Sequence, residues 1–406
     1  MPTSPDAQPR PLAAYFSQLP DRRIQAKCKH LFIDIIMIVV CGTLAGADDF
    51  VALAAFARAK ADWLRERLGL ELPNGIPSHD VLNRVFAAIR PEQFHACFAA
   101  WVADVSAGLK LKQIAIDGKS HRGSKTKRKT EKENTKTQKK KTKSSEYQMI
   151  HMVSAWATEL GLTLGQVKTE EKSNEITAIP EVLKLLDVSG ALVSIDAMGC
   201  QKEIAKQIVD KKGNYLLAVK DNQPRLFEDL KAWAENALDQ DSLELSQNLS
   251  ENRAHGREET RFCFVSEDVE IIRDHQLWPS LRSLVCVVSH REIDGKQSDE
   301  VRFYISSRHG SAKQFQAWVR NHWSIENSCH WVLDVAFRED DHRLREGHAP
   351  ANLSSVRKMA LAMLKKADAK CGIKNKRLRA GWDSDFLEHI LRDYFPAENC
   401  DKTAKS

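Results

Sequence analysis

Two short apolar stretches, far apart in the chain, each end in an aspartate. Ile114–Ile116 leads into Asp117 within KQIAIDGKSHRG, and Leu192–Ile195 leads into Asp196 within LVSIDAMGCQ. Short apolar runs bounded by turn residues are typical of buried strands. Taken alone, an Asp-Gly pair after a strand more often marks a turn. The recurrence of the pattern strengthens a second interpretation, in which both carboxylates gather at one site.

A third carboxylate, Glu326, lies in the segment RNHWSIENSCHWVLD, which we predict to be part of one helix over Ser311–Val335. A buried carboxylate needs a partner, which is either a metal beside Asp117 and Asp196 or a histidine four residues away. Asp334, about a quarter-turn off this face, is the alternative ligand. At 3.6 residues per turn the face of Glu326 is mostly apolar and should pack on a sheet; it comprises Phe315, Val319, His322, Trp323, Cys329, His330, Leu333 and Phe337.

Four motifs resemble those of the insertion-sequence DDE transposases of the H-repeat-associated (ISAs) type: IAIDGKSHRGS, LVSIDAMGCQ, YLLAVKDNQ and RNHWSIENSCHWVLDVAFRED. The resemblance covers about residues 12–366. It implies an RNase H-like catalytic fold in which Asp117, Asp196 and Glu326 are the catalytic, metal-binding triad. It also implies DNA cleavage and strand transfer at the terminal repeats of the element.

Acidic oxygen ligands suit two Mg²⁺ (or Mn²⁺) ions, which would activate the attacking water and stabilise the leaving oxygen. The expected partners are double-stranded DNA, as terminal inverted repeats and as target. Because two ends must be joined, a homodimer on DNA is expected.

The sequence departs from the Tyr-Arg-Glu-Lys signature of the wider superfamily around the glutamate. Val319, His322 and Leu333 occupy the Tyr, Arg and Lys positions. Other cations would then hold the DNA phosphates, or the same residues are ordinary solvated surface groups. The candidates for DNA-backbone contacts near the triad are Lys119, Arg122, Lys220, Arg320 and His322.

The order of elements after residue 110 predicts an α/β fold. Strand, hairpin, helix, strand, helix and strand follow one another, as in a mixed RNase H-like sheet, and ligands gather at the carboxyl ends of strands in such sheets. We predict an all-α domain over 1–109 and a catalytic domain over 110–366 with a β-rich insertion at about 240–310. A basic tail is predicted over 367–406.

The amino-terminal region has the outline of a helix-turn-helix around Asn74–Ala88. His79, Asn83 and Arg84 would lie on the exposed face of the second helix, where base edges are read. A compact helical bundle without DNA contacts is the alternative interpretation.

Leu31–Ala47 is the most hydrophobic stretch, but it is shorter than the roughly 20 residues of a membrane span and contains Asp34. A buried core helix is therefore expected, and no membrane partner. The nine cysteines include no CxxC pair, which is typical of reduced thiols in a cytosolic protein. We expect a cytoplasmic bacterial protein that joins the nucleoid when bound to DNA.

Charge is concentrated in one segment. The whole chain carries a net charge of +6, whereas residues 125–143 hold ten Lys/Arg and two Glu. The rest of the surface is nearly neutral, so DNA affinity must come from local patches. The Lys-rich segment is either a solvated insertion or an arm that grips phosphates, and one loop can be both.

Three other functions compete with transposition. An RNase H-like nuclease would cut DNA without strand transfer, and a transposase-derived protein could bind DNA without catalysis. A hydrolase using Cys329 with His322 or His330 lacks an evident orienting group.

Overall fold

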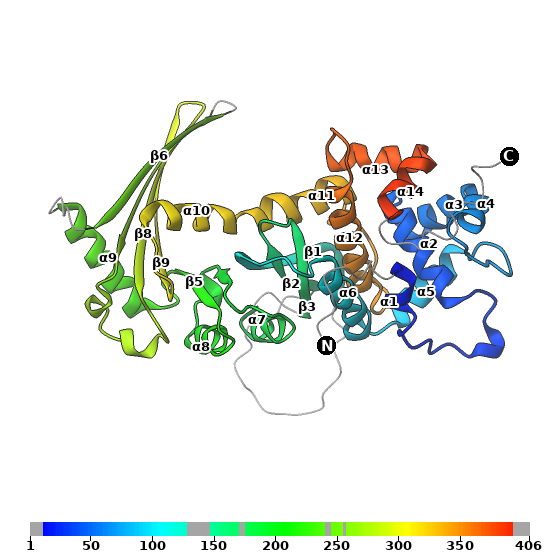
Figure 1. The fold of residues 1–406 in the computed structure, drawn as a ribbon, viewed down its shortest axis with the longest axis horizontal. Coiled ribbons are helices and arrows are strands. Elements are labelled where there is room, and N and C mark those ends of the chain that lie inside the picture. Colours follow the sequence, from blue (N-terminus) through cyan, green and yellow to red (C-terminus); the bar gives the residue numbers. More distant parts are fainter. Residues whose placement is uncertain (1–10, 128–146, 170–174, 240–244, 255–256, 393–406) are drawn as a thin grey trace.

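The computed structural model describes residues 11–127, 147–169, 175–239, 245–254 and 257–392. Figure 1 shows three regions along the long axis: a strand-rich part, a central sheet flanked by helices, and a helical part that contains both ends of the described chain. Most of the predicted Lys-rich arm, residues 128–146, lies outside the described residues.

One sheet of nine strands runs through the first two regions, in the order β3-β2-β1-β4-β5-β9-β8-β7-β6. β4 pairs in parallel with both β1 and β5, and the other pairings are antiparallel. The predicted RNase H-like mixed sheet is confirmed. The strands are β1 (Gln113–Lys127), β2 (Tyr147–Ala157), β3 (Leu162–Thr169), β4 (Leu192–Ile195), β5 (Asn214–Val219), β6 (Ser246–Ala254), β7 (Arg257–Ser266), β8 (Ser283–Ile293) and β9 (Lys296–Ser306).

The predicted β-rich insertion is β6 to β9, and it extends the catalytic sheet because β9 pairs with β5. Three helices follow the strands of the central part: α7 (Glu175–Lys184), α8 (Lys202–Asp210) and α9 (Pro224–Asp239). A long rod made of α10 (Ala312–His322) and α11 (Trp331–Phe337) then crosses from the strand-rich part to the helical part (Figure 1).

The helical part combines the two ends of the chain. Its amino-terminal helices are α1 (Leu12–Phe16), α2 (Phe32–Leu44), α3 (Phe50–Ala59), α4 (Ala61–Glu66), α5 (His79–Ala88) and α6 (Pro91–Val105). Its carboxyl-terminal helices are α12 (Ala349–Lys366), α13 (Ile373–Trp382) and α14 (Ser384–Leu391). α12 contacts α2, α5 and α6 on one side and β2 and β3 on the other. Helices from both sides of the boundaries predicted at 109/110 and 366/367 therefore pack against one another.

Two buried polar side chains connect these helices by hydrogen bonds. The Asn352 amide donates hydrogen bonds to the carbonyls of Phe86 (2.8 Å) and Ile89 (2.9 Å). Arg377 donates to the carbonyl of Thr43 at 2.9 Å and pairs with Asp48 at 2.9 Å. Within the predicted basic tail, Arg377 is therefore buried between helix ends, and residues 393–406 lie outside the described chain.

α2 is the predicted core helix, and all of its residues from Asp34 to Leu44 are buried. The buried Asp34 carboxylate accepts a hydrogen bond from the backbone of Leu72 at 2.9 Å. Burial raises the pKa of Asp34. In the described part of the chain, no helix is both long and apolar enough to cross a membrane.

Candidate active site

Strand register places Asp117 beside Asp196. The parallel pairing of β1 with β4 ends at Ile116 opposite Ile195, and each aspartate is the next residue. Adjacent strands lie about 4.8 Å apart, so the two carboxylates start from neighbouring backbone positions. Asp196 also caps the short helix Ala197–Gly199, because its Oδ1 accepts a hydrogen bond from Met198 N at 3.1 Å.

The predicted turn at Gly118 is wrong. β1 continues to Lys127, and Gly118 pairs with Val153 of β2, because the hairpin partner extends the strand beyond the reach of β4. Glycine is required here for space: a Cβ atom would stand 2.4 Å from His151 Nε2 and 2.5 Å from Glu175 Oε1.

The carboxyl end of α10 is docked on this edge of the sheet. His322 Nδ1 lies 3.0 Å from the hydroxyl of Ser194, two residues before Asp196. The Gln113 amide donates hydrogen bonds to Ser194 Oγ at 3.0 Å and to the carbonyl of Trp318 at 2.8 Å. These bonds bring the turn that follows α10, which carries Glu326, toward the aspartates.

The predicted regular helix is interrupted where Glu326 stands. Residues Glu326–His330 form a single π-helical turn between α10 and α11. This wider turn shifts the 3.6-residue register, and Glu326 is exposed, not buried in the predicted apolar stripe, although Phe315, Cys329 and Leu333 are buried as expected. Single π-turns inside helices occur frequently at functional sites.

The histidine four residues after Glu326 pairs with an aspartate instead. His330 Nδ1 lies 3.4 Å from Asp117 Oδ2. Burial would raise the pKa of Asp117, but the hydrogen bond and charge of His330, helped by the charge of His322, hold it below its ordinary value. Asp117 is therefore an ionised carboxylate in the folded protein at neutral pH.

The charge of Asp117 affects the pKa values of the other two carboxylates. Burial, the charge of Asp117 and then that of Glu175 raise the pKa of Asp196. Partial burial of the carboxylate and the charge of Asp117 also raise the pKa of Glu326, while His330 and Arg302 oppose the shift. The charge of Asp117 thus acts on both Asp196 and Glu326, and a cation beside Asp117 would relieve this repulsion.

The donor set fits a hard divalent cation that is completed by substrate. Among the described residues, no group of three or more acidic, histidine or cysteine side chains is already arranged as a metal cage. Mg²⁺ is usually held by one or two carboxylates together with waters and substrate phosphates. Asp117 and Asp196 would supply the fixed carboxylates, and the exposed Glu326 the third.

Replacing Asp196 by asparagine should stabilise the metal-free protein at neutral pH. A raised carboxyl pKa means that ionisation opposes folding above that pKa, and the penalty fades as the pH falls toward the ordinary value of about 4. Asparagine keeps the cap acceptor. We expect the Asp196→Asn Tm to rise by about 1–3 °C at pH 7 in EDTA, with a smaller gain at pH 4.5. The exposed Asp62→Asn is the control, and a lower Tm for Asp196→Asn at pH 7 would contradict the electrostatic account.

Lys119, predicted to contact phosphate, is already engaged inside the protein. Its ammonium pairs with Asp334 and lies 3.0 Å from Glu339 Oε2. Glu339 is buried and also faces His121 and Arg357, each at 3.7 Å. The alternative ligand Asp334 is thus committed to Lys119. This buried network joins β1 to the end of α11, and the sequence contains no local pattern that indicates it.

A second buried pair stands beside the aspartates. His151 Nε2 lies 2.6 Å from Glu175 Oε1, and His151 Nδ1 lies 2.9 Å from the hydroxyl of Ser120. Both His151 and Glu175 are buried. The pair packs over Gly118 and supplies a fourth negative charge near Asp196, which the sequence analysis missed.

Arg302 of β9 is a cation that the sequence analysis also missed. Its guanidinium stacks 4.5 Å from the centre of the Trp323 ring. It is held by two hydrogen bonds to Glu300, at 2.8 and 2.9 Å. Its charge lowers the pKa values of both His322 and Glu326, although burial has the larger effect on each. The insertion therefore delivers an arginine to the turn where the helix itself has His322.

Three of the four remaining predicted phosphate contacts are exposed. Arg122 has a side chain that is 83% exposed and lies 3.5 Å from Asp340. Lys220 follows the carboxyl end of β5, the edge that also holds Asp196, and Arg320 is exposed on α10. These three can reach a ligand, whereas His322 is tied to Ser194.

The predicted helix-turn-helix differs from the structure in its spacing. Residues 67–78 separate α4 from α5, which is longer than the three- or four-residue turn of that motif. His79 is exposed beside Asp80, but Asn83 donates a hydrogen bond to Glu346 of a distant segment. Arg84 is exposed on another side of α5.

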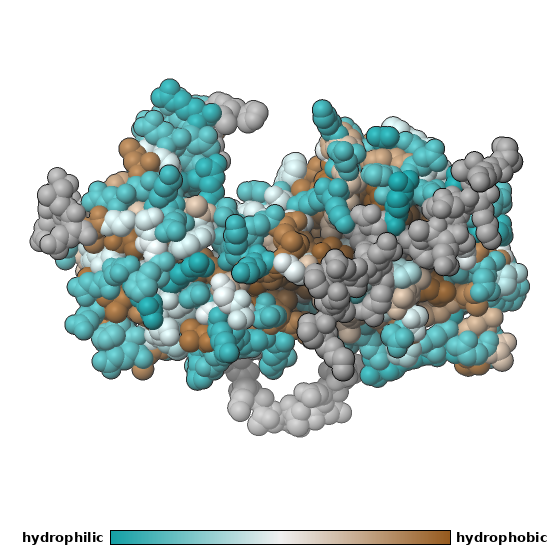
Figure 2. All heavy atoms as spheres, viewed as in Figure 1, coloured by the Kyte–Doolittle hydropathy of each residue, from teal (hydrophilic) through white to brown (hydrophobic). Residues whose placement is uncertain are grey.

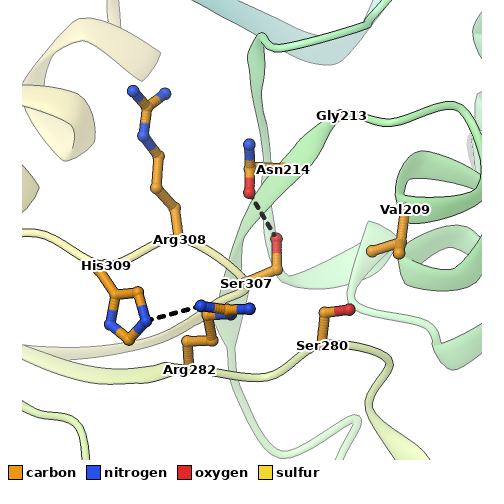
Figure 3. A pocket seen from close by; sticks show the side chains of 8 residues that line it. All are labelled: Val209, Gly213, Asn214, Ser280, Arg282, Ser307, Arg308 and His309. Carbon is orange, nitrogen blue, oxygen red and sulfur yellow. Dashed lines mark hydrogen bonds between the residues drawn. The ribbon is translucent and has the colours of Figure 1, made fainter.

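A polar pocket lies at the opposite edge of the sheet. Figure 3 shows Arg282, His309 and Ser307 around it, near Asn214 at the start of β5. Arg282 Nη1 lies 2.8 Å from His309 Nε2. Because β4 and β5 are parallel, this edge is remote from the ends that carry Asp196. No carboxylate is among the described lining residues.

Comparison with known proteins defines the class. The family described as "Transposase DDE domain" matches residues 109–363, and the family described as "DDE_Tnp_1-associated" matches residues 13–102. The chain belongs to the DDE transposase family, and its resemblance to the H-repeat-associated type is confirmed.

Two relatives span almost the whole chain. "Putative transposase YncI" of Escherichia coli O157:H7 is 41% identical over 391 residues, which cover 94% of each chain. "H repeat-associated putative transposase YhhI" of Escherichia coli K12 is 37% identical over 390 residues, covering 94% of this chain and 97% of the relative. A solved piggyBac transposase synaptic complex with hairpin DNA matches at a TM-score of 0.43 and 11% identity, covering 94% of this chain and 77% of that one.

Proposed function

We propose that this chain binds the terminal repeats of its own element, cleaves the DNA with a divalent metal and transfers the freed strand to target DNA. The observation that supports the proposal is the strand register that makes Asp117 and Asp196 neighbours, together with the effect of the Asp117 charge on the pKa of Glu326. Family membership supports it. We place the protein in the bacterial cytoplasm, acting as a homodimer on DNA.

The three carboxylates would hold one or two Mg²⁺ or Mn²⁺ ions between the sheet edge and the π-turn. When bound, such ions lower the pKa of water and stabilise a leaving 3′-oxygen. His330 orients the Asp117 carboxylate, and the Ser194–His322 bond fixes the helix end that carries Glu326. Arg122, Lys220 and Arg320 are proposed as backbone contacts.

The decisive assay uses DNA that carries the repeats flanking the gene. We expect full-length protein to nick this DNA at the repeat boundary with Mg²⁺ but not with EDTA, and to join precut ends to a target plasmid. Nicking without joining would identify a nuclease. Binding without either activity, in Mg²⁺ and in Mn²⁺, would contradict the proposed function.

Arg302 should act on the cleavage step. Its guanidinium is held rigidly by Glu300 and Trp323 near Glu326, where it can stabilise charge on a phosphate. We expect Arg302→Ala to slow repeat cleavage by about 10–100-fold with little change in affinity for uncut DNA.

Arg308→Ala is the matched control for that variant. Arg308 stacks on Trp318 of α10 at 5.1 Å, but it lines the polar pocket beside Asn214 (Figure 3), away from Asp196. Equal cleavage rates for the two variants would remove Arg302 from the site.

A further inference from the structure

α5 separates two clefts of opposite charge in the helical part. On the side of His79 and Asn83, the cleft has a volume of about 440 Å³. Its acidic residues are Asp48, Asp49, Asp80 and Asp341, against the cations Arg338 and Arg343. We call this the acidic cleft.

The cleft on the other side of α5, which we call the basic groove, has a volume of about 650 Å³. Residues 20–32 form one wall, and α5 with the start of α6 forms the other. Its charged lining is Arg22, Arg23, Lys27, Lys29, Arg84 and Arg90, against the single acid Asp21.

Five of these six cations are available to a ligand. Asp21 is committed to Arg23, with two hydrogen bonds of 2.8 Å. Within the described residues, the other five have no carboxylate within ion-pair distance, and all five are exposed: Arg22, Lys27, Lys29, Arg84 and Arg90. Cations on two facing walls, with the one acidic residue of the described lining already paired to Arg23, form a site for a polyanion.

The basic groove also has apolar lining residues. Phe32, Val85 and Ile89 line it, as does Ile24, which has 66% of its surface exposed. A sugar–phosphate backbone presents both phosphates and apolar sugar faces, and it therefore matches a groove lined by cations and apolar side chains. The negative charge of the acidic cleft disfavours the same ligand on the other side of α5.

We propose that the basic groove holds one sugar–phosphate backbone of a DNA duplex, so that Arg84 and Arg90, not His79 and Asn83, mark the DNA-facing side of α5. The choice of DNA as the polyanion rests on the proposed function. In Figure 1, α5 lies in the helical part, apart from β1, which carries Asp117. The basic groove is therefore a binding contact remote from the cleavage site.

The test compares two double variants of the full-length protein. Arg84→Gln with Arg90→Gln removes two groove cations, one from α5 and one from the residue before α6. Arg58→Gln with Arg343→Gln removes two exposed cations of the same helical part that lie outside the basic groove. Circular dichroism and thermal unfolding establish that both variants are folded.

Affinity for duplex DNA is measured across a salt series. Each phosphate contact contributes about −0.9 to the slope of log K against log salt. The groove variant should lose about two contacts. When salt is raised from 50 to 200 mM, the fold loss of DNA affinity should therefore be about ten times smaller for this variant than for the wild type. The control should keep both the wild-type slope and the wild-type cleavage rate.

Equal slopes for the groove variant and the control would overturn the proposal. An unchanged slope together with an altered association state in sedimentation would assign the basic groove to a protein partner, and would also overturn it. The salt slope is measured from DNA affinity and does not require cleavage. A wild-type protein that binds DNA but never cuts it would therefore contradict the proposed function, while the proposal for the basic groove could still be tested.

Discussion

Asp117→Asn should abolish metal-dependent cleavage of repeat DNA. The charge of Asp117 raises the pKa values of both Asp196 and Glu326, and His330 lowers the pKa of Asp117 itself. Asparagine preserves its shape but removes the negative charge that a cation needs. We expect the cleavage rate to fall by about 100-fold to 1,000-fold. The rate is measured as initial nicking in Mg²⁺ at saturating protein.

DNA affinity should survive that substitution, because the proposed backbone contacts and the basic groove are elsewhere. The control is Asp62→Asn, an exposed aspartate of α4 that should cut at the wild-type rate. Wild-type cutting by Asp117→Asn would end its assignment as a metal ligand.

Glu339→Gln should cause the largest loss of stability. The Glu339 carboxylate is fully buried and faces Lys119 at 3.0 Å and Arg357 at 3.7 Å. Removing its charge leaves Arg357 buried without a paired carboxylate among the described residues and leaves Lys119 with Asp334 alone. Breaking a buried ion pair in this way typically costs about 3–5 kcal/mol. Urea denaturation at pH 7 should show this loss. The surface variant Glu181→Gln, which breaks an exposed pair with Lys184, should lose less than about 1 kcal/mol.

The same carboxylate should contribute to acid sensitivity. Burial would raise the pKa of Glu339, but the charges of His121, Lys119 and Arg357 hold it well below its ordinary value. A depressed carboxyl pKa gives stability that is present above the ordinary value and is lost as the pH falls toward the folded value. The stability gap between wild type and Glu339→Gln should therefore narrow below about pH 4. A constant gap from pH 7 to pH 3 would contradict this cause.

The parts of the fold that could be predicted are those with a local signal. The apolar runs before Asp117 and Asp196, and the alternation of strands and helices after them, indicate the RNase H-like sheet before any contact is known. β6 has no strand signal of its own, because its sequence, SQNLSENRA, is polar and has no apolar alternation. It is a strand because β7 pairs with it along its whole length.

The details missed at the site depend on contacts between distant segments. Whether β1 ends at Gly118 depends on β2, which supplies its partner beyond the reach of β4. Arg302 comes from the insertion, and its approach to Glu326 follows from the pairing of β9 with β5. The exposure of Glu326 results from a π-turn, whereas the prediction used a regular period of 3.6 residues.

Manganese binding tests the central claim, that Asp117, Asp196 and Glu326 act together on one metal site. Mn²⁺ is titrated into full-length protein bound to precut repeat DNA, and the bound ion is counted by electron paramagnetic resonance. We expect Asp117→Asn, Asp196→Asn and Glu326→Gln each to weaken binding by at least about tenfold, while Asp62→Asn matches the wild type. Wild-type Mn²⁺ affinity in any one of the three folded, DNA-bound variants would contradict the claim for that carboxylate.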